Sequence, residues 1–235
     1  MKAIYKRELA SYFTSPLGYV FMAIFLCLSG ILFSSATLQK GADSDVNMYF
    51  VYLLISFIII LPLLTMKLFS EERKTKTEQL LLTSPITITG MVMGKFFAAY
   101  TVFAMTYAAS CIPFLSLYAY GTPNTAQLIG HSVGILLLGA ACIAVGVFVS
   151  SLTENQLIAA IGSMALLFAF VMVGFLSSYI NSAFIRSVLG WISILERYNA
   201  FGNGVFDFSC ILYYVSMAAV FLFATVRVFE KRRWS

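Results

Sequence analysis

Few side chains in this sequence could carry out chemistry, because ionisable residues are scarce and scattered. The 235 residues include one histidine, His131, and four cysteines, Cys27, Cys111, Cys142 and Cys210. The cysteines lie in or beside apolar runs without a CxxC pair, which indicates neither a zinc site nor a disulfide framework. HExxH and paired membrane aspartates are also absent from the sequence, so catalysis lacks its usual groups. We therefore expect no enzyme activity and no metal site.

Two ionisable residues lie inside apolar runs. Lys95 is close to one end of its run, where a lysine can extend its stem to reach water, and we expect it to snorkel in this way. His131 is near the end of another run. A proton relay is one possible role, but we favour a lone histidine at the membrane interface.

A charged segment offers the clearest functional signal. Residues 70–85 read SEERKTKTEQLLLTSP. Ser70 is placed to cap a helix whose first turn carries Glu71 and Glu72, acids that the helix dipole favours there. Three leucines would give the helix an apolar end, and Pro85 would stop it. Such a helix could dock on a cytosolic partner, although the features alone also fit a solvated charged loop.

The elements that position these residues are membrane spans. Hydrophobic residues make up 60% of the chain and charged residues 11%, against about 45–50% and about 25% in soluble domains. Long unbroken apolar runs indicate helices. We predict an all-α integral membrane protein, a single transmembrane domain over 1–235. Its parts are an amphipathic elbow at 1–16 and spans at 17–38, 48–66, 91–118, 128–152, 157–179 and 209–229.

The stretch between the fifth and sixth spans is too short and too charged to cross the membrane. We predict an interfacial or re-entrant helix there, followed by a glycine-rich turn. Its candidate functional residues are Glu196, Phe201, Gly204 and Asp207, and Asp207 is placed to cap the last span.

Small residues at helical spacing predict close packing of the fourth and fifth spans, since small side chains let helices approach in lipid. The residues concerned are Gly146, Ser150, Ala159, Ser163 and Gly174. Packing within the chain is favoured over a dimer seam.

The distribution of positive charge predicts the orientation. If both termini are cytoplasmic, only Lys40, Arg186 and Arg197 of the 15 Lys and Arg residues lie in outer loops. Positive charge accumulates on the cytoplasmic side of membrane proteins. We expect a multi-pass protein of a prokaryotic plasma (inner) membrane with both termini in the cytoplasm.

Three segments resemble one family. Residues 71–86 (EERKTKTEQLLLTSPI) look like the loop between the second and third spans of type-2 ATP-binding-cassette (ABC) permeases, and most of all their gliding-motility and copper-export-accessory branch. Residues 194–207 (ILERYNAFGNGVFD) are similar to the family's outer segment, and residues 6–20 (KRELASYFTSPLGYV) to its elbow. The chain departs from the pattern at Lys76, where the family often has glycine.

The resemblance implies that two six-span chains pair, as a homodimer or with a related permease, through spans one and five. It also implies that a coupling helix of each chain sits in a cleft of a separate cytosolic ABC ATPase. The residues assigned to this docking are Glu71, Glu72, Arg73, Lys74, Thr77, Glu78 and Leu81. The sequence has no GxxxxGK[ST] motif. We therefore expect no cofactor in this chain, because ATP and Mg²⁺ would be bound by the partner subunit. We also expect that the chain binds no nucleic acid.

These observations predict the permease of an ATP-driven exporter. The scarcity of charge in the spans favours a hydrophobic or amphipathic substrate. A secondary, ion-coupled transporter is the alternative, but it would place ionisable groups or broken helices at the midplane. An importer permease is disfavoured, because its glycine-containing EAA-type loop is not recognisable.

Overall fold

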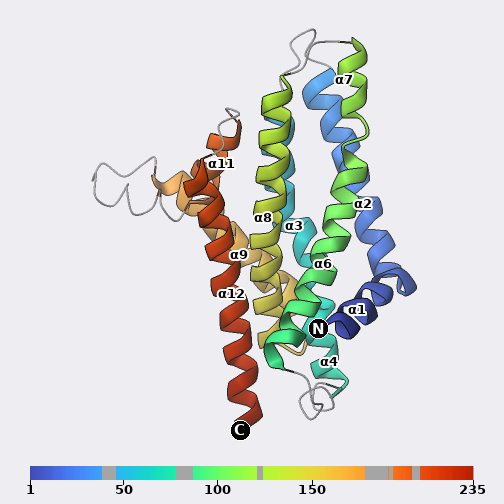
Figure 1. Ribbon diagram of the computed structural model, residues 1–235, viewed down its shortest axis with the longest axis vertical. Coiled ribbons are helices and arrows are strands. Elements are labelled where there is room, and N and C mark those ends of the chain that lie inside the picture. The colour runs from blue at the N-terminus through green and yellow to red at the C-terminus, as the bar shows by residue number, and fades with distance from the viewer. Residues whose placement is uncertain are drawn as a thin grey trace.

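The structure is a computed structural model, and it describes residues 1–38, 46–77, 87–120, 124–177, 190, 193–202 and 207–234. These residues form helices and short connections, with no strand among them. The predicted all-α class is confirmed. Figure 1 shows an elongated bundle with both ends of the chain toward the same end of the molecule.

Within the described residues, six helical stretches are long and apolar enough to cross a membrane, which agrees with the predicted number of spans. They are α2 (Pro16–Phe33), α3 (Asn47–Thr65) with α4 (Lys67–Lys74), α6 (Ile88–Ser110) with α7 (Phe114–Tyr120), α8 (Thr125–Leu152), α9 (Gln156–Ser177) and α12 (Phe208–Trp234). The other elements in the described residues are α1 (Lys2–Thr14), the π-helical turn η1 (Ser34–Leu38) and α11 (Ile194–Gly202).

Local chemistry accounts for where several helices begin. Pro16 occupies the first turn of α2, where its missing N–H costs nothing. The Asn124 side chain accepts from the amide of Ala126 at 3.1 Å and so caps α8. Asp207 accepts from the amide of Ser209 at 2.9 Å at the start of α12, which confirms the predicted cap.

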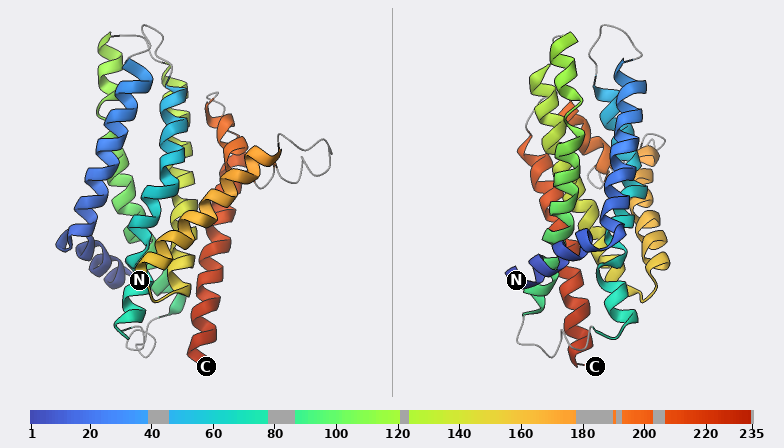
Figure 2. Two further views of the ribbon diagram at one scale, coloured as in Figure 1. Left: turned by 180° about the vertical axis from the view of Figure 1, so that it is seen from behind. Right: turned by 90° about the vertical axis from the view of Figure 1, so that its right-hand side faces the viewer.

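Helix α8 is the centre of the bundle and packs against α3, α4, α6, α9, α11 and α12. Figure 1 shows α12 and α6 flanking α8, and Figure 2 shows α9 running obliquely across the bundle. Its small residues allow this close approach. A Cβ added to Gly146, for example, would lie 2.8 Å from the Cβ of Thr65 on α3.

Helix α1 lies crosswise to the spans in the lower part of the bundle and packs on α6 and α2 (Figure 2). The Tyr12 hydroxyl donates to the carbonyl of Leu64 at 2.9 Å, which ties α1 to the end of α3. Burial and the nearby carboxylate of Glu8 raise the pKa of Tyr12, so its hydroxyl stays protonated. We call this end of the molecule, where α1, α4 and the start of α6 meet, the charged end.

Candidate functional site

Helix α4 carries most of the residues that the sequence marks for docking. It begins at Lys67, directly after α3, with Met66 between them in helical geometry. Ser70 is buried inside α4 and its hydroxyl donates to the carbonyl of Met66. The prediction that Ser70 caps a new helix is therefore wrong, because Ser70 lies within α4 and its hydroxyl bonds to the preceding turn.

The end of α4 has a left-handed residue. Lys76 has φ +59°, and its amide donates to the carbonyl of Arg73 at 3.1 Å. Helices commonly end in this conformation, and glycine is the usual residue there because other side chains are strained. The turn thus needs a glycine-like backbone at the position where the chain departs from the permease pattern.

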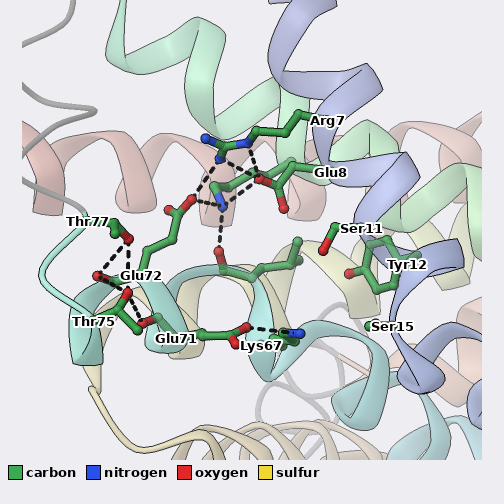
Figure 3. A pocket seen from close by; sticks show the side chains of 12 residues that line it. Arg7, Glu8, Ser11, Tyr12, Ser15, Lys67, Glu71, Glu72, Thr75 and Thr77 are labelled. Carbon is green, nitrogen blue, oxygen red and sulfur yellow. Dashed lines mark hydrogen bonds and ion pairs between the residues drawn. The ribbon is translucent and has the colours of Figure 1, made fainter.

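Four charged side chains from three elements meet at the charged end, and we call them the ion cluster: Arg7 and Glu8 of α1, Glu72 of α4 and Lys95 of α6. Arg7 Nη2 lies 2.6 Å from Glu8 Oε1 and 2.8 Å from Glu72 Oε1. Lys95 Nζ lies 2.9 Å from Glu72 Oε1 and 3.3 Å from Glu8 Oε1. Each carboxylate therefore contacts both cations, and Figure 3 shows α1 and α4 facing each other across this network.

Lys95 is the buried member of the cluster, with 0% of its surface exposed. Its ammonium also donates to the carbonyl of Leu68 at 2.6 Å and lies 4.9 Å from the centre of the Phe69 ring. The prediction that Lys95 snorkels is wrong. Helices α1 and α4 cover it and bring two carboxylates to it, so it has no need to reach water.

The cluster balances its charge, with two cations and two anions. A buried charge without a partner is costly, whereas one with well-placed partners and hydrogen bonds is tolerated. Burial alone would lower the pKa of Arg7, but hydrogen bonds to Glu8 and Glu72 and their negative charge outweigh it, and the pKa is raised. The cluster therefore links three helices through contacts between opposite charges.

A second set of contacts ties α4 to the end of α8. The Ser150 hydroxyl accepts from the amides of Phe69 and Ser70 at 3.1 and 3.3 Å and donates to the carbonyl of Met66 at 3.2 Å. Just beyond, Arg73 Nε lies 2.9 Å from Glu154 Oε1. Arg73 also donates to the carbonyl of Leu152 at 2.8 Å.

The other predicted docking residues face outward. Glu71 pairs only loosely with Lys67, at 3.2 Å along the same helix, and both are partly exposed. Lys74 and Thr77 are exposed. Glu78 and Leu81 lie outside the described residues. The structure thus divides the predicted set into Glu72 and Arg73, which bind other parts of the chain, and Glu71, Lys74 and Thr77, whose side chains are available at the surface.

A cavity of about 340 Å³ separates α1 from α4 beside the ion cluster. Figure 3 shows its polar lining, which includes Ser11, Tyr12 and Thr75. Its mixed charges do not select a metal ion, and in the described part of the chain no three His, Cys, Asp or Glu side chains lie close enough to hold one.

The predicted packing residues make contacts within the chain. Gly146 meets Thr65, and Ser150 meets α4 as described above. Ala159 and Ser163 are buried in α9, where the Ser163 hydroxyl donates to the carbonyl of Ala159 at 2.7 Å. A Cβ on Gly174 would lie 2.5 Å from the Ser193 hydroxyl, next to α11.

The opposite end of the bundle holds a polar contact that the sequence did not reveal. His131 is buried, with Nδ1 2.9 Å from the Tyr198 hydroxyl and Nε2 2.8 Å from Asn47 Oδ1. Its ring stacks on Phe50, with centroids 4.3 Å apart. The prediction of a lone interfacial histidine is wrong, because α11 covers the ring and α3 supplies a second partner.

Of the predicted outer-segment residues, Phe201 is fully buried and packs where Gly134 of α8 leaves room. Asp207 caps α12. Gly204 lies outside the described residues, as does the side chain of Glu196.

Sequence reasoning missed Arg7, Glu8 and Lys95 as members of the site. One signal was present: a lysine inside an apolar run needs a partner in the membrane, and acids on another element are the natural candidates. Which acids those are depends on how α1 folds back onto α6.

Residues 4–234 match the family model described as ABC-2 family transporter protein. A search of curated proteins found no match. The match does not support the narrower resemblance to the gliding-motility and copper-export-accessory branch. Because it covers nearly all of the chain and the structure has six candidate spans, the protein belongs to the ABC-2 transporter family and is a membrane-embedded ABC permease.

Proposed function

We propose that this permease couples ATP hydrolysis by a separate cytosolic ATPase subunit to the export of a hydrophobic or amphipathic substrate. In this proposal α4 is the coupling helix that the ATPase moves. The family implies association with a cytosolic ATPase. The direction of transport and the substrate class are inferences from the resemblance and from the apolar spans.

The observation that carries the proposal is the attachment of α4 to several spans. The ion cluster joins α4 to α1 and α6, and Ser150 and Arg73 join it to the end of α8. Helix α4 also follows α3 with almost no break. A force applied to α4 would therefore reach three spans directly, as a coupling element requires.

The exposed part of α4 supports the docking role. Glu71 and Lys74 of α4, and Thr77 in the turn that follows it, have side chains at the surface, and no ion pair in the described residues joins them to another element. We propose that these side chains meet the ATPase, while Glu72 and Arg73 transmit its movement to the bundle. Glu78 and Leu81 belong to the same proposed surface.

The substrate proposal is supported by the distribution of charge. In the part of the chain that the structure describes, Lys95 is the only Lys, Arg, Asp or Glu that is fully buried, and it lies at the charged end. A path along these spans would be lined mainly by apolar and aromatic side chains, which suits a substrate of similar polarity.

We also propose that two chains pair, as copies of one permease or as two related ones, through α2 and α9. Helix α9 leaves large apolar side chains exposed along its length, including Leu157, Ile161 and Phe168. A partner helix or lipid must cover them.

The test is purification of the tagged chain in mild detergent and identification of any protein with a phosphate-binding loop that comes with it. Glu71→Lys combined with Lys74→Glu should reduce the recovered ATPase by at least about tenfold, since two charges of the proposed interface are reversed. Lys231→Glu is the matched control, because it reverses an exposed charge near the end of α12 and should leave recovery unchanged. Transport that ignores ATP and stops with an ionophore would refute the proposal in favour of a secondary transporter.

A further inference from the structure

An apolar groove of about 620 Å³ runs between α6 and α12 and has α8 as its floor. Figure 1 shows these three helices side by side. The hollow exists because small side chains, Ala140 of α8 and Ala218 and Ala219 of α12, stand where larger ones would fill it. On its rim, Val215 and Phe223 are more than half exposed. All three helices are candidate membrane spans, so the groove lies at a depth that lipid chains occupy.

The length of the groove fits one hydrocarbon chain that enters from the charged end. Along α6 it extends from Thr89 to Tyr100, eleven residues apart, or about 17 Å of helix. Along α12 it extends from Glu230 to Tyr214, about 24 Å. These lengths lie between one leaflet and the whole of a hydrocarbon core that is about 30 Å thick. The groove therefore begins at one membrane surface and ends within the bilayer.

The mouth of the groove carries one charge of each sign. Arg227 Nη1 lies 2.8 Å from Glu230 Oε2, and both side chains are partly exposed. The guanidinium of Arg227 lies 4.8 Å from the centre of the Phe223 ring, so it stands directly above the apolar lining. Thr89 lies on the facing wall. A cation next to an anion complements a zwitterion better than it complements an ion of either sign alone.

We propose that this groove binds a bilayer phospholipid with a zwitterionic headgroup, with one acyl chain lying between α6 and α12. The lipid phosphate contacts Arg227 and Thr89, and its ammonium group contacts Glu230. The site is separate from the surface of α4 and does not depend on the proposed coupling to ATP.

Bound lipid is the measurement that tests the proposal. The full chain is released from nanodiscs of phosphatidylethanolamine and phosphatidylglycerol in equal amounts, and native mass spectrometry counts the lipids retained. We expect one phosphatidylethanolamine per chain, preferred about tenfold over phosphatidylglycerol. No retained lipid, or equal retention of the two, would overturn the proposal.

A matched pair of variants locates the lipid. Ala219→Trp fills the groove from an exposed position, and Met93→Trp fills it from the facing wall. Val220→Trp adds the same bulk to the next residue of α12, which is 62% exposed and does not line the groove. The two filling variants should each lower retention about tenfold and the control should not. Equal retention in all three would place the lipid elsewhere and refute the site.

Two further experiments distinguish a zwitterionic lipid from other occupants of the groove. Arg227→Gln with Glu230→Gln should keep a bound lipid but abolish the preference for the zwitterionic headgroup, and a preference that survives would contradict the role of the charge pair. Cysteine introduced at position 219 should not cross-link two copies. An efficient cross-link would mean that a second copy of the chain fills the groove.

Discussion

Lys95 illustrates how a single side chain can join elements that are far apart in the sequence. It contacts Glu8 of α1, Glu72 and the Leu68 carbonyl, all within 3.3 Å. Because its ammonium is buried, its contribution depends on all of these partners being present. Removing one partner of a buried ion pair leaves the others without compensation.

We predict that Lys95→Met destabilises the protein by about 3–5 kcal/mol, since Glu8 and Glu72 are then left with Arg7 alone. Thermal unfolding in detergent measures the loss. Lys2→Met, at an exposed position of α1, should have little effect. The double variant Lys95→Met with Glu72→Gln should lose less stability than the sum of the losses of the two single variants. The reason is that Glu72→Gln removes an anion that Lys95→Met has left without one of its partners. Additive losses would mean that the cluster does not act as a unit.

Lys76 is strained, because its backbone adopts a left-handed conformation that suits glycine. A non-glycine residue in the left-handed region destabilises the folded state by roughly 1–2 kcal/mol. Glycine removes this strain, but it also makes the unfolded chain more flexible, which offsets about 0.5–1 kcal/mol of the stability gained. We predict that Lys76→Gly slows hydrogen exchange of the amides of Thr75 and Lys76, which bond to the carbonyls of Glu71 and Arg73. Thr75→Gly, at φ −85°, should speed exchange instead. Faster exchange in Lys76→Gly would show that the lysine side chain itself stabilises the turn.

Among the elements, the short helices α1 and α11 lie toward opposite ends of the molecule. Helix α1 closes over the start of α6 and completes the ion cluster. Helix α11 packs on α8 and α9 at the other end, where Phe201 and Tyr198 meet Gly134. Each depends on a polar contact to a buried residue of a span, Lys95 in one case and His131 in the other.

We predict that His131→Phe loosens α11. The new ring can keep the stacking on Phe50, but it loses the hydrogen bonds to Tyr198 and Asn47. Hydrogen exchange in α11 should become faster while exchange at the charged end does not change. Ile129→Phe, on the exposed side of the same helix, is the control. Unchanged protection of α11 would show that packing of Phe201 and Tyr214 is enough to hold it.

Over the whole molecule, positive charge accumulates at the end that carries α4 and both ends of the chain. This distribution predicts that the charged end is cytoplasmic. A membrane-impermeant thiol reagent should label Thr75→Cys only after the cells are permeabilised. It should label Ala126→Cys, at the opposite end of the bundle, in intact cells. The reverse pattern would place α4 beyond the reach of a cytosolic ATPase and would contradict the proposed function.

The native chain serves as the reference in that experiment. Cys27 is exposed within a span, Cys111 is partly buried, and Cys142 and Cys210 are buried. None of them should react with a reagent that stays in water.

The sequence by itself determined the class of protein, the number of spans and the cap at Asp207. These properties depend on runs of neighbouring residues, because length and apolarity decide whether a helix can cross a membrane. The order of three short segments also pointed to the permease family.

Only the tertiary structure decided which side chains meet. Lys95 was expected to snorkel to water and His131 to stand alone at the interface, but both are buried with partners on other elements. The reason is that an ion pair or hydrogen bond between distant segments depends on how helices cross, which a local pattern does not record. Glu71 and Glu72 are neighbours in the sequence, yet one turns to the surface and the other to Lys95. That division follows from where α1 and α6 lie around α4.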